Sequence, residues 1–152
     1  MIKIGVLDKS KSETIRKLLQ NICTNLPVQI CDGLCKPLDV LIIDKIPKIS
    51  QGVNHPSQKV IIANSDDSQV LQFVSAMGAQ IITYGFNPKA AITASSHNDD
   101  IFVICIQRAM TTIQGIPLLP REFSITIKNH EAFDECIMGT IATALICGAN
   151  FD

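Results

Sequence analysis

Acidic and amide side chains follow the apolar segments of this chain in a repeated pattern. Asp8 comes directly after the first apolar run, Asp44 after a later one, and Asn64 after the next. In a parallel α/β sheet the carboxyl ends of the strands meet at one edge, where ligands bind. Carboxylates at such an edge can attract a divalent cation. The sequence therefore predicts one polar crevice, formed by Asp8, Lys9, Ser12, Asp44, Asn64, Asp66 and Asp67, with Tyr84 at the end of a further strand.

A simpler interpretation competes with a functional crevice. Strands end where the chain reaches the surface, so polar residues follow them in any α/β protein. For each residue taken singly, we favour this surface role. Lys9 and Lys11 could bind an anion at the start of a helix, but we prefer to interpret them as solvated turn lysines.

Histidines and cysteines add little further chemistry. The three histidines lie in separate polar stretches, and no Ser-His-Asp or Cys-His arrangement follows from their spacing. Cys23, Cys31 and Cys35 could form a thiolate metal site, but their spacing is not that of a zinc knuckle, and the nearest histidine is His55. We therefore expect no bound metal ion.

The first twenty residues predict the strand, turn and helix that would position Asp8 and Lys9. Residues 2–7 are apolar and β-branched, as in a buried parallel strand. Residues 11–23 repeat apolar side chains at helical spacing, which predicts a helix with one side against a sheet. Ser10 or Ser12 can cap that helix by accepting a backbone N–H.

The alternation of strands and helices continues to residue 84. Strands are predicted at residues 28–31, 38–43, 59–63 and 80–84, and a helix at residues 68–77. This order implies a mainly parallel sheet that is covered by helices.

The pattern changes after residue 90. Residues 90–96, 101–109 and 122–128 are strand-like and have no helix between them, which predicts a small antiparallel extension within residues 90–128. Residues 130–148 predict a closing helix. Its apolar side is expected to contain Phe133, Ile137, Ile141 and Leu145. We predict a single three-layer, Rossmann-like α/β domain over residues 1–152.

Composition narrows the classes of function. Apolar residues make up 47% of the chain and charged residues 18%, a balance that argues against disorder. The net charge of -1 and the lack of a basic run argue against binding to nucleic acid or to an anionic membrane. No signal peptide or membrane-spanning run is evident, so we expect a soluble cytoplasmic protein.

Several segments together resemble the central ATPase domain of the Mur ligases, the ATP-dependent amide-forming enzymes of bacterial peptidoglycan synthesis. Residues 4–14 lie in register with that family's strand and G-T-N-G-K-T-T turn. Asp44 lies at the position of an acidic magnesium ligand, and residues 60–67 resemble a V-x-N-x-D-D strand end near the adenine. Residues 81–85 resemble an I-T-x-G strand, and residues 139–148 resemble an alanine-rich helix. The likeness spans the whole chain and implies the same α/β fold.

The residues that would hold ATP are replaced. In the register of the resemblance, the glycines of the phosphate loop fall at Asp8 and Lys11, and the catalytic lysine falls at Ser12. Glycine lets backbone N–H groups approach a phosphate, whereas a carboxylate repels it. Phe133 and Cys136 replace two asparagines that contact nucleotide, and the ligand-binding domain of the family has no counterpart. We therefore expect a non-catalytic relative with a degenerate P-loop.

This interpretation implies no nucleotide cofactor and no catalytic residue. The domain would act through an unknown protein partner or a small ligand. A homo-oligomer is compatible with the apolar closing helix, which contains small residues.

A response-regulator receiver domain is the second resemblance. Residues 39–44 and 78–82 resemble its strands, and Asp44 would then be the phosphoacceptor. Asp8 and Lys9 would replace the acidic pair that holds Mg²⁺, which leaves one carboxylate too few. Gly85 or Phe86 stands where a lysine is expected, and Pro47 lies one position closer to the aspartate than usual.

Overall fold

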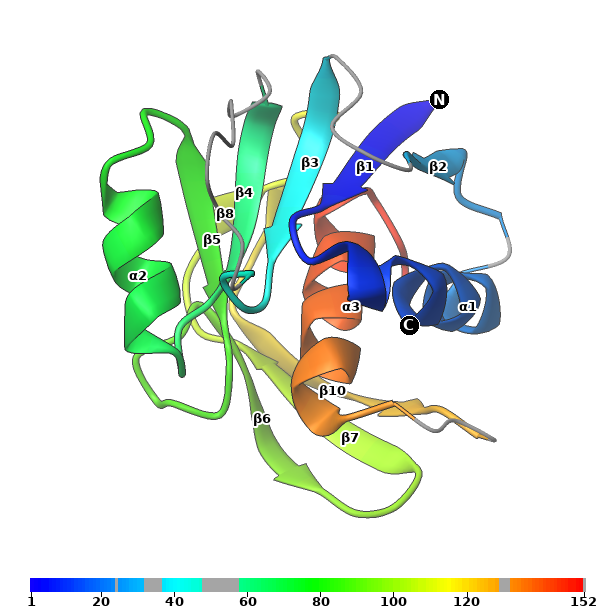
Figure 1. The fold of residues 1–152 in the computed structure, drawn as a ribbon. Helices are drawn as coiled ribbons and strands as arrows, with labels where there is room; N and C mark the ends of the chain where they lie inside the picture. Colours follow the sequence, from blue (N-terminus) through cyan, green and yellow to red (C-terminus); the bar gives the residue numbers. More distant parts are fainter. Residues whose placement is uncertain (24, 32–36, 48–57, 129–131, 152) are drawn as a thin grey trace.

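The computed structural model describes residues 1–23, 25–31, 37–47, 58–128 and 132–151 of the 152-residue chain. Its centre is an eight-stranded mixed sheet with the order β10-β7-β6-β5-β4-β3-β1-β2, and a separate two-stranded sheet joins β8 to β9 (Figure 1). From β2 to β6 the neighbouring strands run parallel, whereas β7 and β10 join antiparallel. The predicted α/β class, with a mainly parallel sheet and an antiparallel extension, is confirmed.

The elements follow the predicted order, and the two short strands β8 and β9 were not predicted. The strands are β1 (Ile2–Val6), β2 (Val28–Ile30), β3 (Leu38–Ile43), β4 (Gln58–Asn64), β5 (Gln80–Tyr84), β6 (Ile92–His97), β7 (Ile101–Ile106), β8 (Met110–Thr111), β9 (Pro117–Leu118) and β10 (Arg121–Thr126). The helices are the 3-10 turn η1 (Lys9–Lys11), α1 (Ser12–Ile22), α2 (Ser68–Ser75) and α3 (Asp134–Ile146).

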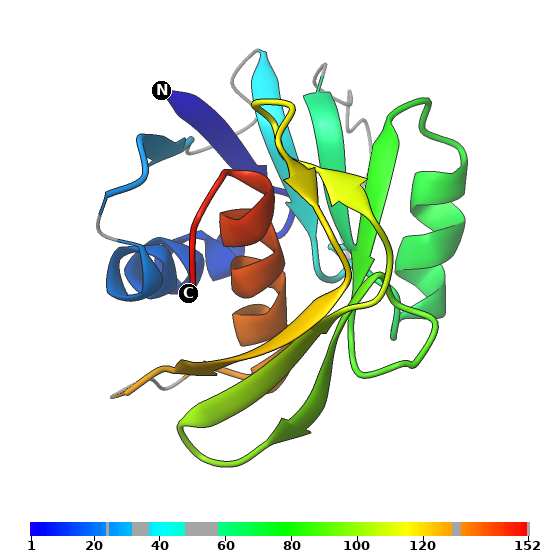
Figure 2. The same ribbon diagram turned by 180° about the vertical axis from the view of Figure 1, so that it is seen from behind.

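Two faces of the sheet bury two separate cores, because alternate residues of a strand point to opposite sides. On one face, Val40 and Ile42 of β3 pack with the side chains of α1 and α3. On the other face, Leu41 and Ile43 pack with α2. Figures 1 and 2 show α2 on the opposite side of the sheet from α1 and α3. The domain therefore has the three layers that the sequence predicts.

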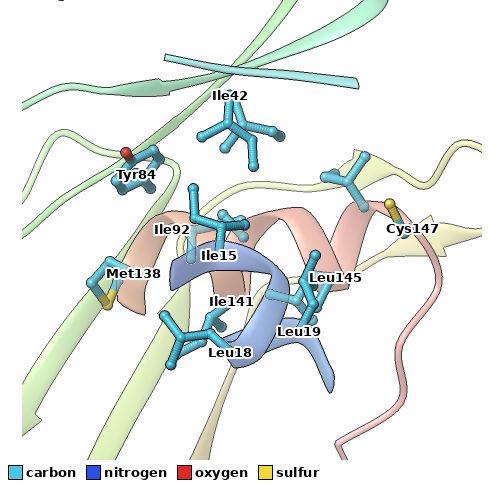
Figure 3. Close-up of a cluster of buried hydrophobic side chains, with 14 of the residues drawn as sticks. Ile15, Leu18, Leu19, Ile42, Tyr84, Ile92, Met138, Ile141, Leu145 and Cys147 are labelled. Carbon is cyan, nitrogen blue, oxygen red and sulfur yellow. The ribbon is translucent and has the colours of Figure 1, made fainter. Parts of the chain in front are cut away.

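Helix α3 is buried on every side. Each residue from Cys136 to Cys147 is buried, and the helix has no polar face. A helix that is apolar all round belongs inside a protein. Figure 3 shows Ile141 and Leu145 of α3 gathered with Leu18 and Leu19 of α1. This burial, from Cys136 to Cys147, lies within one copy of the chain.

Phe133 is the exception to the predicted apolar side of α3. Its backbone is extended at the N-cap position, outside the helix, and its side chain is 72% exposed. The prediction that it faces the core was wrong, because the helix begins one residue later than the apolar pattern requires.

The antiparallel extension is continuous with the main sheet. Strand β6 pairs with β5 through Tyr84 and Ile92, and then with β7 on its other side. Along the extension, Phe102 and Ile104 face the core beneath α3. On β10 and just after it, Ser124 and Thr126 are exposed while Ile125 and Ile127 are buried, as a sheet with one wet face requires.

Candidate functional site

The turn between β1 and α1 is closed by its own side chain. Asp8 accepts hydrogen bonds at one carboxylate oxygen from the backbone N–H of Ser10, at 3.1 Å, and from the hydroxyl of Ser10, at 2.7 Å. These bonds cap η1, and α1 follows with Lys11 at its N-cap and no side-chain cap. The prediction that Ser10 or Ser12 caps the helix was wrong. The Ser10 hydroxyl donates its hydrogen to Asp8 and accepts no backbone N–H of α1, and the N-cap residue of α1 is Lys11.

Asp44 lies buried where β3 ends and is held from two neighbouring strands. The hydroxyl of Tyr84, at the end of β5, donates to Oδ1 of Asp44 at 2.5 Å. The side-chain amide of Asn64, at the end of β4, donates to the Asp44 carbonyl oxygen at 3.2 Å and lies 3.4 Å from Oδ1. Asp44 and Asn64 are each 3% exposed and Tyr84 is 0% exposed. The structure therefore brings three of the predicted residues together.

The electrostatic environment favours the neutral form of Asp44. Burial raises the pKa of its carboxyl above the ordinary value, while the hydrogen bond from Tyr84 and the charge of Lys11 act in the opposite direction. Burial, and then the charge of Asp44, raise the pKa of Tyr84 well above its usual range. Tyr84 is therefore protonated at neutral pH and can act as a hydrogen-bond donor to Asp44.

Cys136, in the first turn of α3, belongs to the same cluster. Burial and the charge of Asp44 raise the pKa of its thiol to about 11, and Lys11, Glu135 and Asp8 act on it more weakly. The buried thiol is therefore not an activated nucleophile. In the sequence Cys136 was noted only as a replacement for an asparagine, and no spacing rule linked it to Asp44.

A glycine lets Tyr84 fit beneath α3. A Cβ placed on Gly139 would lie 2.9 Å from both Cζ and the hydroxyl oxygen of Tyr84. Such a contact is too short for real atoms, so a larger residue would displace the ring. Figure 3 shows Tyr84 beside α3, close to Met138. The helix and the tyrosine together cover Asp44.

Asp66 and Asp67 have structural partners. Asp66 accepts hydrogen bonds from the backbone N–H groups of Phe86, at 2.7 Å, and Asn87, at 2.9 Å. The Asp67 side chain caps α2 by accepting from the backbone N–H of Gln69, at 2.9 Å. Both carboxylates therefore stabilise local backbone structure at the carboxyl edge of the sheet.

The other predicted residues differ in their exposure. Lys9 is exposed, whereas Ser12 is buried at the start of α1. Lys11 is partly buried, and its ammonium group lies 5.2 Å from the centre of the Phe133 ring. The crevice that the sequence predicts is thus an edge where Asp8, Asp44, Asn64, Asp66 and Asp67 all have partners within the chain.

A groove lies away from this edge, between α1 and β2. Its volume is about 290 Å³. It is lined by Arg16, Leu19, Gln20, Leu26, Val28, Gln29 and Ile30. The lining of the groove is both polar and apolar, and it shares no residue with the predicted crevice. The sequence contained no motif that would reveal it.

Among the residues that the structure describes, no group of three or more histidine, cysteine, aspartate or glutamate side chains could hold a metal ion. Cys23 and Cys31 are free thiols, and Cys35, His55 and His130 lie outside the described residues.

Within the part of the chain that the structure describes, no helix is long and apolar enough to cross a membrane. In comparisons with known proteins, no family model and no curated protein matches this chain.

Proposed function

We propose that this protein is a non-catalytic relative of the Mur ligase central domain that has lost ATP binding and acts through a protein partner or a small ligand. The observation that carries the proposal is the closure of the turn after β1. Asp8 occupies that turn with its own carboxylate and accepts two hydrogen bonds from Ser10. The N–H and hydroxyl of Ser10, which would face a bound phosphate, therefore donate to the carboxylate of Asp8 instead.

The rest of the carboxyl edge supports the same proposal. Asp44, at the position of the family's magnesium ligand, is buried and is paired with Tyr84. Asp66, which in the register of the resemblance corresponds to a residue near the adenine of bound ATP, accepts hydrogen bonds from the backbone N–H groups of Phe86 and Asn87. A nucleotide would have to displace each of these contacts.

Isothermal titration with Mg-ATP tests the loss of nucleotide binding. We expect no heat of binding at micromolar concentrations and no release of phosphate. Micromolar affinity, or any hydrolysis that depends on the protein, would refute the proposal. The Asp44→Asn variant is a suitable control, because it removes the carboxylate at the position of the magnesium ligand.

A repaired variant tests the register of the resemblance. The changes Asp8→Gly, Lys11→Gly and Ser12→Lys restore the glycines and the lysine of a phosphate loop in the existing turn. Because α1 begins at Ser12, the new lysine would lie in the first helical position. We expect this variant to gain weak binding of ATP, and the change Ser12→Lys alone to gain none.

A receiver-like domain that is phosphorylated on Asp44 is the second candidate. The strand order favours it. β2 lies on one side of β1 and β3 on the other, so the order of the strands reverses there, and ligands bind at such a reversal. The 3% exposure of Asp44 and its bond from Tyr84 speak against it. Beryllofluoride with Mg²⁺ should change the fluorescence of Tyr84 if Asp44 is a phosphoacceptor, and Asp44→Asn should abolish that change. No response would exclude this candidate.

A further inference from the structure

The start of α3, from its N-cap Phe133 to Cys136, is in contact with two other elements of the fold, and we call residues 133–136 the clasp. Its outer residues Phe133 and Glu135 are exposed. Its last residue, Cys136, is 3% exposed and lies within electrostatic range of Asp44 and Tyr84. The clasp is thus the end of α3 where exposed residues give way to buried ones.

The helix alone holds the clasp weakly. Among the described residues, no side chain caps the N-terminus of α3, so the first N–H groups lack the acceptor that such a cap would supply. Gly139 follows within one turn, and glycine weakens a helix interior. The hydroxyl of Thr140 donates to the carbonyl oxygen of Cys136 at 2.8 Å, a type of bond that slightly destabilises helices.

Contacts with other elements hold the clasp from both sides. Nε2 of His97, at the end of β6, lies 3.0 Å from Oδ2 of Asp134. The His97 ring stacks on Phe102 at a centroid distance of 5.6 Å, and it lies 5.1 Å from Phe86. On the other side, the ammonium group of Lys11 lies over the Phe133 ring, a favourable cation–π contact.

We propose that the clasp opens as a local unit, with His97 as its tether, and that opening exposes Cys136 while the rest of α3 stays in place. The two rings fix the position of the His97 imidazole, so the 3.0 Å contact to Asp134 anchors the clasp to the sheet. The inference depends only on these contacts and is independent of the proposed loss of ATP binding.

The two ends of α3 provide an internal reference for such an opening. Cys136 lies in the clasp, and Cys147 is a buried residue at the other end of the same helix. Local opening exposes Cys136 alone, whereas global unfolding exposes both thiols. Labelling of the native full-length protein with N-ethylmaleimide at fixed pH, followed by peptide mass spectrometry, measures the two rates separately.

Asp134→Ala removes the tether, and Glu135→Ala is its matched control. Both changes remove an acidic residue from the first turn of α3, so they alter the helix dipole alike. Asp134 contacts His97, whereas Glu135 acts on Cys136 only through its charge, which raises the pKa of that thiol, so only the first change breaks the tether. His97→Phe keeps an aromatic ring between Phe86 and Phe102 but removes Nε2, the atom that contacts Asp134.

We expect Asp134→Ala and His97→Phe each to accelerate the labelling of Cys136 by about two- to five-fold, the range for a partly exposed ion pair. Labelling of Cys147 should not change, and Glu135→Ala should have a smaller effect. The double variant Asp134→Ala/His97→Phe should label Cys136 no faster than either single variant, because the changes remove one contact.

Three results would overturn the inference. The first is equal acceleration of Cys136 and Cys147, which indicates global unfolding. The second is equal acceleration of Cys136 in Asp134→Ala and Glu135→Ala, which indicates a dipole effect. The third is no acceleration in Asp134→Ala and His97→Phe. Hydrogen exchange checks the result without thiol chemistry: in Asp134→Ala the Ile137 amide, which donates to Phe133, should exchange faster, and the Cys147 amide, which donates to Thr143, should not.

Discussion

The hydroxyl of Tyr84 donates to Oδ1 of Asp44 at 2.5 Å and joins the end of β5 to the end of β3 across 40 residues of sequence. Both residues are buried, and Tyr84 lies under α3 where Gly139 leaves room. Tyr84 is the only tyrosine of a chain without tryptophan. Intrinsic fluorescence of this protein therefore reports on this one hydrogen bond.

The buried carboxyl of Asp44 should make the protein less stable as the pH rises. Because burial raises its pKa in the folded state, the stability that the neutral carboxyl contributes is present below the ordinary range of aspartate and is lost as the pH rises through the folded pKa. Asp44→Asn should therefore increase the free energy of unfolding at pH 8, because the amide stays neutral and can still accept a hydrogen bond from Tyr84. Urea unfolding at pH 4 and pH 8 measures the difference, which should shrink at the lower pH. A difference independent of pH would contradict this prediction.

Asp39 should show the opposite dependence on pH and serves as the contrasting variant. The backbone N–H of Lys3 donates to Oδ2 of Asp39 at 2.8 Å, and this bond lowers the pKa of Asp39 in the folded state. The resulting stability is present above the ordinary range of aspartate and is lost as the pH falls through the folded pKa. In the same urea series, Asp39→Asn should destabilise the protein at pH 7, with an effect that fades toward acidic pH.

Tyr84→Phe should destabilise the protein, because it leaves a buried carboxyl without its donor. We expect a loss of about 1–3 kcal/mol. The loss should be larger at pH 8 than at pH 4, since an ionised acceptor makes the stronger hydrogen bond. Circular dichroism must follow this variant, which has no tyrosine. An unchanged midpoint in urea would show that the bond contributes little.

Gly139→Ala should be destabilising for a steric reason. Its Cβ would meet the Tyr84 ring and hydroxyl at 2.9 Å, and overpacking of this kind costs about 1–3 kcal/mol. Gly78→Ala is the control, because its Cβ would meet nothing within 4 Å. Removing the hydroxyl relieves one of the two contacts, so Gly139→Ala in the Tyr84→Phe background should cost less. Thermal unfolding of the four proteins measures this coupling.

Asp66→Ala should loosen the turn after β5 rather than alter a ligand site. The change removes the acceptor of the Phe86 and Asn87 backbone N–H groups, so these two amides should exchange with solvent faster. Asp67→Ala is the comparison: it removes the cap of α2 and should cost about 1 kcal/mol of stability without affecting those amides. Hydrogen exchange measured by nuclear magnetic resonance distinguishes the two effects.

Periodic patterns predicted most of the fold. The apolar run at residues 38–43 and the helical spacing at Ile137, Ile141 and Leu145 were enough to place β3 and α3, because burial there follows from hydrophobicity alone. The ends of β3 and β5 were predicted correctly, and β4 runs one residue further than predicted, to Asn64. Asp44 and Asn64 were therefore expected at one edge.

What the sequence did not predict depends on contacts between distant residues. The Tyr84 hydroxyl meets Asp44 only because β4 separates β3 from β5 and α3 covers them, and nothing near Tyr84 in the sequence indicates this. The contact between His97 and Asp134 joins two polar stretches whose spacing matches no motif. Phe133 was placed in the core because its apolar character fits the helical pattern, whereas its extended backbone ends that pattern.

Helix α3, which is buried on every side, is also the last regular element of the chain. During synthesis, every strand of the sheet leaves the ribosome before the helix that fills its core. Until α3 is synthesised, the side chains of β1, β3, β6 and β7 that pack in the same core as α3 are exposed to water. Native folding can finish only when α3 arrives, and until then the nascent chain is a natural client for chaperones that bind apolar surface.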